Sequence, residues 1–358
     1  MARSPRARST AERPGGAVTL QQVAQHAGVS IATASRALHG ATGRAVGEEL
    51  RRRVLAAAAE LGYVSNAPAQ ALARSRSSVV GLIVHDITDP YFGEIAAGVM
   101  RVAREGDLMV ILAATFRDPQ LELEYLLRVR NQRASGVLLA GSGFTDPAFV
   151  ARLGERLAGF VEDGGRVVCI GEHGADTDLV TVDNRRAAEL AVAHLWELGH
   201  RRIGVIAGPG ELVTVQHRLD GVRRALTARG ATLPPDRVVE ADFTRDGGRV
   251  ATRELFAARP DLTAVLALND GMAAGALAAL QEDLGRAVPA EVSVVGFGGL
   301  PFTVDLHPAL TTVRLPLERI GARAMELILD EPDHRGARRI VELDVDLAVR
   351  SSTRPARG

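Results

Sequence analysis

The sequence predicts a multidomain protein, in which an all-α helix-turn-helix head precedes a larger α/β core built on parallel sheets. Residues 19–38 have the period of two short helices separated by a tight turn. From Val79 onward, short apolar runs alternate with helical stretches, which is typical of parallel sheets covered by helices. The chain of 358 residues is long enough for two or three domains, each with its own core.

The head is predicted from the stretch TLQQVAQHAGVSIATASRAL at residues 19–38. Thr19 and Gln22 have the spacing of a capping box at the start of the first helix, and Ser30 is a candidate cap for the second. Gly28 falls at the turn, where the backbone often needs a positive φ. The pattern is that of a helix-turn-helix, in which the second helix enters the major groove of DNA.

A third helix, from about Glu48 to Leu61, closes the predicted head, and Gly62 ends it. The run Arg51–Arg53 faces outward, either as a solvated surface or as a set of phosphate contacts. The next stretch, YVSNAPAQALARSRSS, is either an interdomain linker or a short helix capped by Asn66.

The core is predicted to contain nine apolar strands, in order VVGLIV, LMVILAA, GVLLAG, VVCIG, LVTVD, RIGVIAG, VVEAD, AVLALN and VSVVGFG. Helices are expected between them, around residues 91–105, 119–132, 146–162, 184–198, 215–229, 246–258 and 270–283. In such sheets a ligand lies beyond the carboxyl ends of the strands. The residues directly after each strand are therefore the candidates for a binding site.

Charge is distributed unevenly along the chain, although the formal net charge is zero. Residues 1–77 contain eleven Arg, four Glu and no Asp, a net charge of +7, so residues 78–358 carry −7. A basic front end on an acidic body is expected of a DNA-binding head attached to a domain with another ligand. The single cysteine, Cys169, excludes an intramolecular disulfide. With no secretory signal and no membrane-spanning apolar run, we expect a cytoplasmic, nucleoid-associated protein.

Three stretches, TLQQVAQHAGVSIATASRALHG, LRRRVLAAAAELGYVSNAPAQALA and VVGLIVHDITDPYFGEIAAGV, resemble the lac repressor/gal repressor family of bacterial transcription regulators. The resemblance continues to about residue 350. It implies a periplasmic-binding-protein-like core of two parallel-sheet subdomains, joined by several crossovers and separated by an effector cleft. It also implies a homodimeric regulator, most often a repressor, that binds a near-palindromic double-stranded DNA operator and uses no cofactor or metal.

These patterns divide the chain into five parts: a disordered basic arm (1–16), the helix-turn-helix domain (17–64), the hinge helix or linker (65–77), the effector-binding domain (78–350) and a loose tail (351–358). Within the effector-binding domain, the expected first subdomain is about 78–180 and 313–335. The expected second subdomain is about 181–312 and 336–350.

The resemblance also suggests which residues contact DNA. Ile31 and Ala32 match positions that reach base edges, and Arg36, one turn later, can bond a guanine bidentately. Phosphate and other contacts are expected from Thr19, Ser30, Thr33 and Ser35. In the hinge, Asn66, Ala71 and Leu72 complete the set, with Leu72 matching a leucine that is pressed into the minor groove at the operator centre.

Candidate effector contacts follow the strands of the core, namely Asp89, Tyr91, Phe92, Ser142, Arg218, Phe243, Asn269 and Asp270. By resemblance, the aromatic side chains stack on a ligand ring and Arg218 clamps a polar group. Two simpler roles compete with ligand contact, because Asp89 can begin a turn before Pro90 and Asp270 can cap the following helix.

Two departures from the family pattern concern the ligand. Gly171 replaces an aspartate that the family usually has after the strand VVCI, and GFGG places Gly298 and Gly299 where the family has a polar pair. The loss of an acceptor that a buried hydroxyl needs costs roughly 1–3 kcal/mol. The expected effector is a sugar or sugar derivative first and a purine or nucleoside second, with Glu172, His173 or Ser142 as substitute partners. Control by a protein signal is the remaining alternative.

Other functional classes fit the sequence less well. A periplasmic solute-binding protein would share residues 79–350 but would not carry the basic head. An enzyme is not indicated, because the sequence has no P-loop, no GxGxxG after a strand, no GxSxG and no HExxH.

Overall fold

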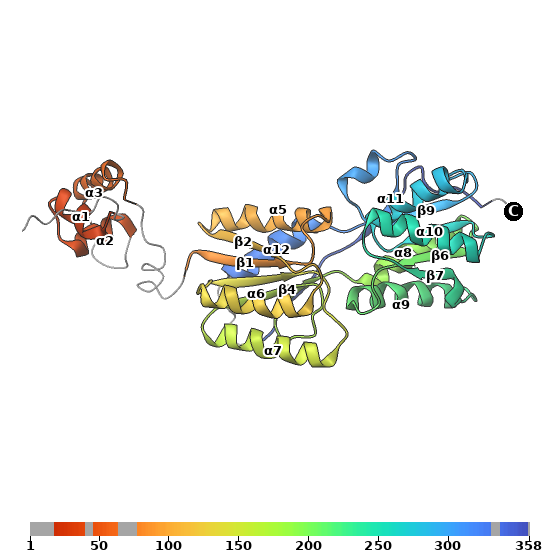
Figure 1. Cartoon of the computed structure of the whole chain (residues 1–358), viewed down its shortest axis with the longest axis horizontal. Coiled ribbons are helices and arrows are strands. Elements are labelled where there is room, and N and C mark those ends of the chain that lie inside the picture. Colours follow the sequence, from red (N-terminus) through yellow and green to blue (C-terminus); the bar gives the residue numbers. More distant parts are fainter. Residues whose placement is uncertain (1–17, 40–45, 64–76, 331–336, 357–358) are drawn as a thin grey trace, which may run out of the picture. The chain divides into compact units, whose positions relative to one another are not determined.

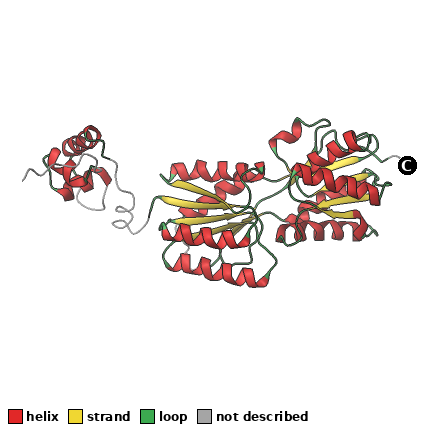
Figure 2. Cartoon of the chain, in the orientation of Figure 1, coloured by secondary structure: helices red, strands yellow, loops and turns green. Residues whose placement is uncertain are grey.

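The computed structural model describes residues 18–39, 46–63, 77–330 and 337–356. The chain separates into two compact units, residues 1–75 and 76–358. Figures 1 and 2 show the helices and strands of each unit in chain order.

Several sequence-based expectations fall outside the described residues. These are the basic arm at 1–16 and the hinge positions Asn66, Ala71 and Leu72. Within the described part of the chain, no helix is both long enough and apolar enough to cross a membrane.

The first unit contains the three predicted helices, α1 (Leu20–His26), α2 (Ile31–His39) and α3 (Glu48–Glu60). They enclose a small core of buried Val23, Ala24, Ala27, Ala34, Ala37, Val54, Ala57 and Ala58. The predicted capping box is confirmed, because Thr19 Oγ1 accepts from the Gln22 amide while Gln22 Oε1 accepts from the Thr19 amide. Caps of this kind stabilise a helix by about 1 kcal/mol. Gly28, with φ of +65°, makes the turn between α1 and α2.

Arg53 departs from the expectation for the arginine run on α3. Its Nη2 donates to the carbonyl of Ala27, the C-cap of α1, at 2.6 Å. A Cβ at Gly28 would lie only 3.1 Å from the same Nη2. Gly28 therefore both makes the turn and leaves room for the side chain that closes the end of α1.

The second unit begins with a six-stranded sheet in the order β11-β5-β4-β3-β1-β2, in which all neighbours are parallel. Its strands are β1 (Val79–Val84), β2 (Met109–Ala114), β3 (Gly136–Ala140), β4 (Arg166–Ile170), β5 (Asp178–Thr181) and β11 (Ile340–Glu342). One face carries α5 (Pro90–Glu105) and α12 (Leu317–Leu329), and the other carries α6 (Pro119–Asn131) and α7 (Pro147–Glu162) (Figure 1). We call this sheet with its helices subdomain one.

Subdomain two repeats the arrangement with the order β12-β10-β9-β8-β6-β7, in which only β12 is antiparallel to its neighbour. Its strands are β6 (Ile203–Ala207), β7 (Val238–Glu240), β8 (Ala264–Ala267), β9 (Ser293–Gly298), β10 (Thr311–Arg314) and β12 (Asp346–Ala348). Helices α8 (Asn184–Glu197) and α9 (Val213–Thr227) pack together, as do α10 (Arg245–Ala258) and α11 (Asp270–Ala278). Short helical turns follow at Pro235–Arg237, Ala279–Asp283 and Pro301–Val304. This architecture confirms the predicted fold class.

The chain crosses between the two sheets three times, and the last two crossings differ from the expected boundaries. β10 belongs to the second sheet, although residues from 313 onward were expected in subdomain one. β11 lies in the first sheet, because Ile340–Glu342 pairs with β5, although residues 336–350 were expected in subdomain two. The physical reason is strand pairing, since short segments such as these are placed by the sheet edge that accepts their backbone hydrogen bonds.

Residues 351–356 contact the core of subdomain two, in contrast to the loose tail that was expected from residue 351. Ser352 is fully buried. Its hydroxyl donates to the carbonyl of Val294 at 2.6 Å and accepts from the amide of Thr311 at 2.8 Å. His200 Nε2 lies 3.0 Å from the carbonyl oxygen of Arg354. The segment therefore closes the side of β9 and β10.

We expect Ser352→Ala to lower the free energy of unfolding by about 1–3 kcal/mol, because it leaves the buried Val294 carbonyl and Thr311 amide without this partner. Urea unfolding of the full chain measures the loss. Ser351→Ala is the matched control, because Ser351 is exposed and its hydroxyl donates to the Ala309 carbonyl at a long 3.5 Å. Equal stability of the two variants would contradict the role given to Ser352.

A buried carboxyl group adds a pH dependence to the stability of subdomain one. Glu122 on α6 is 2% exposed, and its Oε1 has no hydrogen-bond partner in the described residues. Burial raises the pKa of Glu122 from 4.5 to about 8. The folded state therefore holds a proton that the unfolded state has lost, so stability falls as the pH rises from about 4.5 to about 8.

We expect Glu122→Gln to remove this dependence and to raise stability at neutral pH, with a largest slope difference of about 1.4 kcal/mol per pH unit. Denaturation of both proteins from pH 6 to 8 tests it. Glu124→Gln serves as the control on the same helix, because Glu124 is half-exposed and paired with Arg128. Parallel pH profiles of Glu122→Gln and the parent chain would show that the carboxyl group is ionised in the folded state.

Candidate effector-binding and DNA-binding sites

A cavity lies where the carboxyl ends of strands from both sheets converge within the second unit. The space inside it, together with the open solvent at its mouth, is about 550 Å³. The lining residues are His85, Asp89, Tyr91, Phe92, Arg117, Gly141, Ser142, Leu212, Thr214, Arg218, Phe243, Asn269, Phe297 and Leu300. Seven of the eight expected effector contacts are among them, and Asp270 is the exception.

Arg218 is the most deeply buried charged group of this cavity, at 5% exposure. Its Nε donates to Asn184 Oδ1 at 2.9 Å and its Nη1 to the carbonyl of Leu268 at 2.5 Å. The guanidinium lies 3.9 Å from the ring centroid of Phe297. Burial lowers the pKa of Arg218 to about 10, so the group still carries its charge at neutral pH. The bonds hold it against α8 and β8 and leave further N–H groups toward the cavity.

Asp89 combines the two roles that the sequence left open. Its Oδ1 accepts from the amide of Tyr91 at 3.0 Å as the N-cap of α5, and the same residue lines the cavity. Burial raises its pKa, which Arg117 and Arg218 counteract in part. Asp89 is therefore a carboxylate with capacity for a ligand donor, held in place by the start of the helix.

Asp270 was expected to contact the effector, but it does not line the cavity and instead bonds to other parts of subdomain two. It is fully buried, and its Oδ1 accepts from Thr312 Oγ1 at 2.6 Å while Oδ2 accepts from the Leu300 amide at 2.8 Å. The carboxylate thus binds the loop after β9 to β10. Asn269 fills the capping role, because its Oδ1 accepts from the Met272 amide at 2.7 Å and its Nδ2 donates to the Phe243 carbonyl.

The glycines that replace polar residues of the family occupy backbone positions that disfavour side chains. Gly171 has φ of +87°, and a Cβ there would lie 2.2 Å from the carbonyl oxygen of Gly141. Gly298 and Gly299 have φ of +145° and +75°, and their Cβ atoms would approach Asp270 and Arg314 within 2.9 Å. The polar groups absent from these positions are therefore excluded by the local backbone.

Sequence reasoning missed seven lining residues, and the two that bear titratable side chains are His85, directly after β1, and Arg117, three residues after the end of β2. His85 lies between the rings of Phe92 and Phe144, with centroids 5.9 Å away in both cases. Burial lowers its pKa to about 3, so the ring is neutral, and its Nε2 has no hydrogen-bond partner in the described residues. The signal available was position, because His85 is the first residue after β1.

Arg117 reaches across the cavity from subdomain one. Its guanidinium carbon lies 5.4 Å from the ring centroid of Phe243 in subdomain two. Phe116 and Arg117 have φ of +53° and +62°, a conformation that costs roughly 1–2 kcal/mol per non-glycine residue. Such strain persists where the surrounding structure imposes it, often at a functional site.

Hydrogen bonds also join the two subdomains beside the cavity. The amide of Thr214 donates to Ser142 Oγ at 2.9 Å, and the amide of Val213 donates to the Gly143 carbonyl at 2.9 Å. Phe144 and Leu212 form an antiparallel bridge. Ser142 therefore connects the subdomains as well as lining the cavity.

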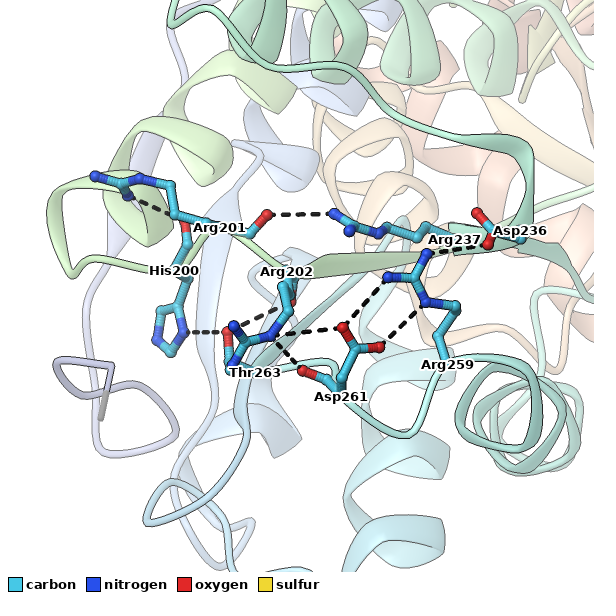
Figure 3. A network of polar contacts seen from close by, with 8 residues as sticks. All are labelled: His200, Arg201, Arg202, Asp236, Arg237, Arg259, Asp261 and Thr263. Atoms are coloured by element: carbon cyan, nitrogen blue, oxygen red, sulfur yellow. Dashed lines mark hydrogen bonds and ion pairs between the residues drawn. The ribbon is translucent and has the colours of Figure 1, made fainter. Parts of the chain in front are cut away.

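A second polar cluster lies at the amino ends of β6, β7 and β8, the end of the sheet away from the cavity (Figure 3). Asp261 accepts from Arg259 Nε at 3.1 Å, and the Asp261 carbonyl accepts from Arg202 Nε at 2.7 Å. Arg259 also donates to Asp236 at 3.0 Å. The cluster is bonded internally and stabilises the strand ends.

Among the described residues, no group of three or more His, Cys, Asp or Glu could hold a metal ion.

The head presents the expected contact residues on the start of α2. Ile31 is 51% exposed and Ala32 is also exposed. Ser30 Oγ accepts from the Thr33 amide at 3.1 Å, which confirms the predicted cap. Arg36 Nε donates to the carbonyl of Ala32 at 3.2 Å. Ala34 and Ala37 of α2 are buried in the core of the head, whereas Ile31 and Ala32 at the start of the helix are exposed.

A helix-turn-helix head on a two-subdomain core of this topology defines a DNA-binding regulator with a ligand-binding domain. Residues 19–66 match the family of bacterial regulatory proteins of the lacI type, and residues 192–353 match the periplasmic binding protein-like domain. The transcriptional repressor CytR of Escherichia coli K12 is 34% identical over 348 residues, 96% of this chain and 98% of CytR. The regulator GalR of the same strain is 32% identical, covering 88% of this chain and 90% of GalR.

Solved structures agree with this assignment. The lac repressor bound to ONPG in the repressed state superposes with a TM-score of 0.83 at 26% identity, covering 94% of this chain and all of that chain. The complex of the transcriptional regulator CelR with cellobiose has a TM-score of 0.67 at 32% identity, covering 94% and 99% of the two chains. The protein belongs to the lacI family and is a DNA-binding transcriptional regulator.

We expect Gly171→Ala to destabilise the chain more than Gly164→Ala. Both glycines have similar φ values, +87° and +85°, but only at Gly171 would the new Cβ meet backbone, and at Gly164 nothing lies within 4 Å. Both variants lose about 1–2 kcal/mol from the left-handed conformation, and Gly171→Ala should lose at least about 1 kcal/mol more from overpacking. Thermal unfolding of the pair makes the comparison, and equal losses would rule out the steric explanation for the missing family aspartate.

Proposed function

We propose that the protein is an effector-controlled repressor that binds a near-palindromic operator as a homodimer. The observation that carries the control step is a cavity lined from both subdomains, beside backbone bonds that join them. A ligand that fits one arrangement of the subdomains better than another shifts the population toward that arrangement. The same free-energy difference then changes the affinity for DNA.

The proposed effector is a sugar or sugar derivative, with a purine or nucleoside as the second class. Aromatic rings of Tyr91, Phe92 and Phe243 line the cavity and suit a ring-shaped ligand. A relative was solved with cellobiose and another lacI-family regulator with ribose. We place this regulation in the cytoplasm, at the nucleoid.

The proposed dimer is supported by an apolar surface on subdomain one. Edge strand β2 exposes Met109 at 60% and Ile111 at 40%, and nearby in the sequence Phe116 is 66% exposed. Exposed apolar residues on an edge strand mark a surface that a second chain can cover. The lac repressor was solved as a dimer bound to its operator.

For DNA reading, we propose that Arg36 bonds a guanine in each half-site, while Ile31 and Ala32 contact thymine methyl groups. The DNA phosphate backbone is then proposed to be contacted by the hydroxyl side chains of Thr19, Ser30, Thr33 and Ser35. Asn66, Ala71 and Leu72 are proposed to form the hinge contacts in the minor groove.

We expect Arg36→Ala to lose about 1–3 kcal/mol of operator affinity and to relax specificity at one position of each half-site. Competitive binding of the full chain to operator variants, read by fluorescence anisotropy, measures both effects. Arg52→Ala on α3 is the control, because Arg52 is exposed and paired with Glu49. If Arg36→Ala weakens binding equally on all sequences, Arg36 contacts only the phosphate backbone.

A further inference from the structure

The cavity holds more positive than negative charge. Arg218 lines it from α9 in subdomain two, and Arg117 lines it from the loop after β2 in subdomain one. Asp89 is the one carboxylate among the lining residues. No ion pair joins either arginine to a carboxylate in the part of the chain that is described, so both charges are balanced only at a distance.

Arg117 acts electrostatically on the carboxylates of Asp86 and Asp89, which both accept hydrogen bonds from their own loop. Asp86 Oδ1 accepts from the amide of Thr88 at 2.9 Å and from its hydroxyl at 2.7 Å. Asp89 accepts from the Tyr91 amide. The Nε of Arg117 is buried without a hydrogen-bond partner in the described residues. A buried N–H group without a partner destabilises the folded state.

Two of the side-chain acceptors that line the same cavity are already used within the protein. The Oδ1 of Asn269 is used by the Met272 amide, and Ser142 Oγ by the Thr214 amide. The glycines at 171, 298 and 299 supply no side chain. A neutral polyol, whose hydroxyls need several acceptors, is poorly matched to this lining, whereas an anion matches the unpaired N–H groups.

We propose that the effector is a small organic anion, with a carboxylate or phosphate group on a ring, recognised by Arg117 and Arg218 together. This inference rests on the proposed effector site and deepens it. The ring lies against the aromatic walls at Tyr91 and Phe243. Because the two arginines come from different subdomains, one anionic group attracts both walls of the cleft and favours the closed arrangement. The strained backbone at Phe116 and Arg117 holds the guanidinium over the cavity in advance.

The test is calorimetric titration of the full chain with ligands matched in their ring and differing in charge. The sets are glucose, glucuronate and glucose 6-phosphate; ribose and ribose 5-phosphate; and cytidine and cytidine 5′-monophosphate. We expect a charged member to bind about tenfold or more tightly than its neutral partner, and its affinity to fall as salt rises. The carboxylate and phosphate arms distinguish the two kinds of anion.

Two variants locate the effect. Arg117→Gln should weaken the charged ligand about tenfold or more and leave a neutral ligand unchanged, while Arg117→Lys should recover part of the affinity. Arg104→Gln is the matched control, an exposed arginine at the end of α5, and should bind as the parent chain does. Thermal unfolding of each variant confirms that it is folded. The fall in affinity of the parent chain with rising salt tests the same proposal without any substitution.

Binding of a neutral member as tightly as its charged partner, or no binding by any charged member, overturns the proposal. Operator binding is measured on the same preparations. If the operator is bound and the charged ligands are not, the anionic assignment fails alone. If the operator is not bound under any condition, the proposed regulatory function fails as well.

Discussion

The burial of the Arg218 guanidinium is the constraint on which the effector domain depends. A charge at this depth is tolerated only where it is bonded and balanced. Asn184 at the start of α8, the Leu268 carbonyl after β8 and the Phe297 ring of β9 supply those contacts. The residue therefore ties three elements of subdomain two to one point at the carboxyl edge of the sheet, where it meets the cavity.

The proposed effector control would act where the two subdomains of the second unit are joined. Contacts across the cleft include the Ser142–Thr214 and Gly143–Val213 hydrogen bonds, the Phe144–Leu212 bridge, the Glu172–His217 ion pair and the approach of Arg117 to Phe243. Several of these residues also line the cavity, namely Arg117, Ser142, Leu212, Thr214 and Phe243. A ligand there can strengthen or replace them directly, and interactions of a few kcal/mol suffice to shift a two-state equilibrium.

Local patterns predicted much of the molecule because their physics acts over a few residues. The capping box of Thr19 and Gln22, the turn at Gly28 and the alternation of strands and helices all appear as expected. Asp270 shows the limit. The residue is adjacent to Asn269, but the fold directs its carboxylate to Thr312, 42 positions away, and no spacing in the sequence indicates that contact.

From the sequence, periodicity determined the helix-turn-helix head and the α/β class. The family resemblance supplied the division into two sheets and half of the residues that line the cavity. Only the tertiary structure decided the sheet to which β10 and β11 belong, the burial of Ser352, and the burial of the Arg117 Nε without a hydrogen-bond partner among the described residues. The reason is physical, since strand pairing, desolvation and charge balance depend on neighbours that are distant in the chain and meet only when it has folded.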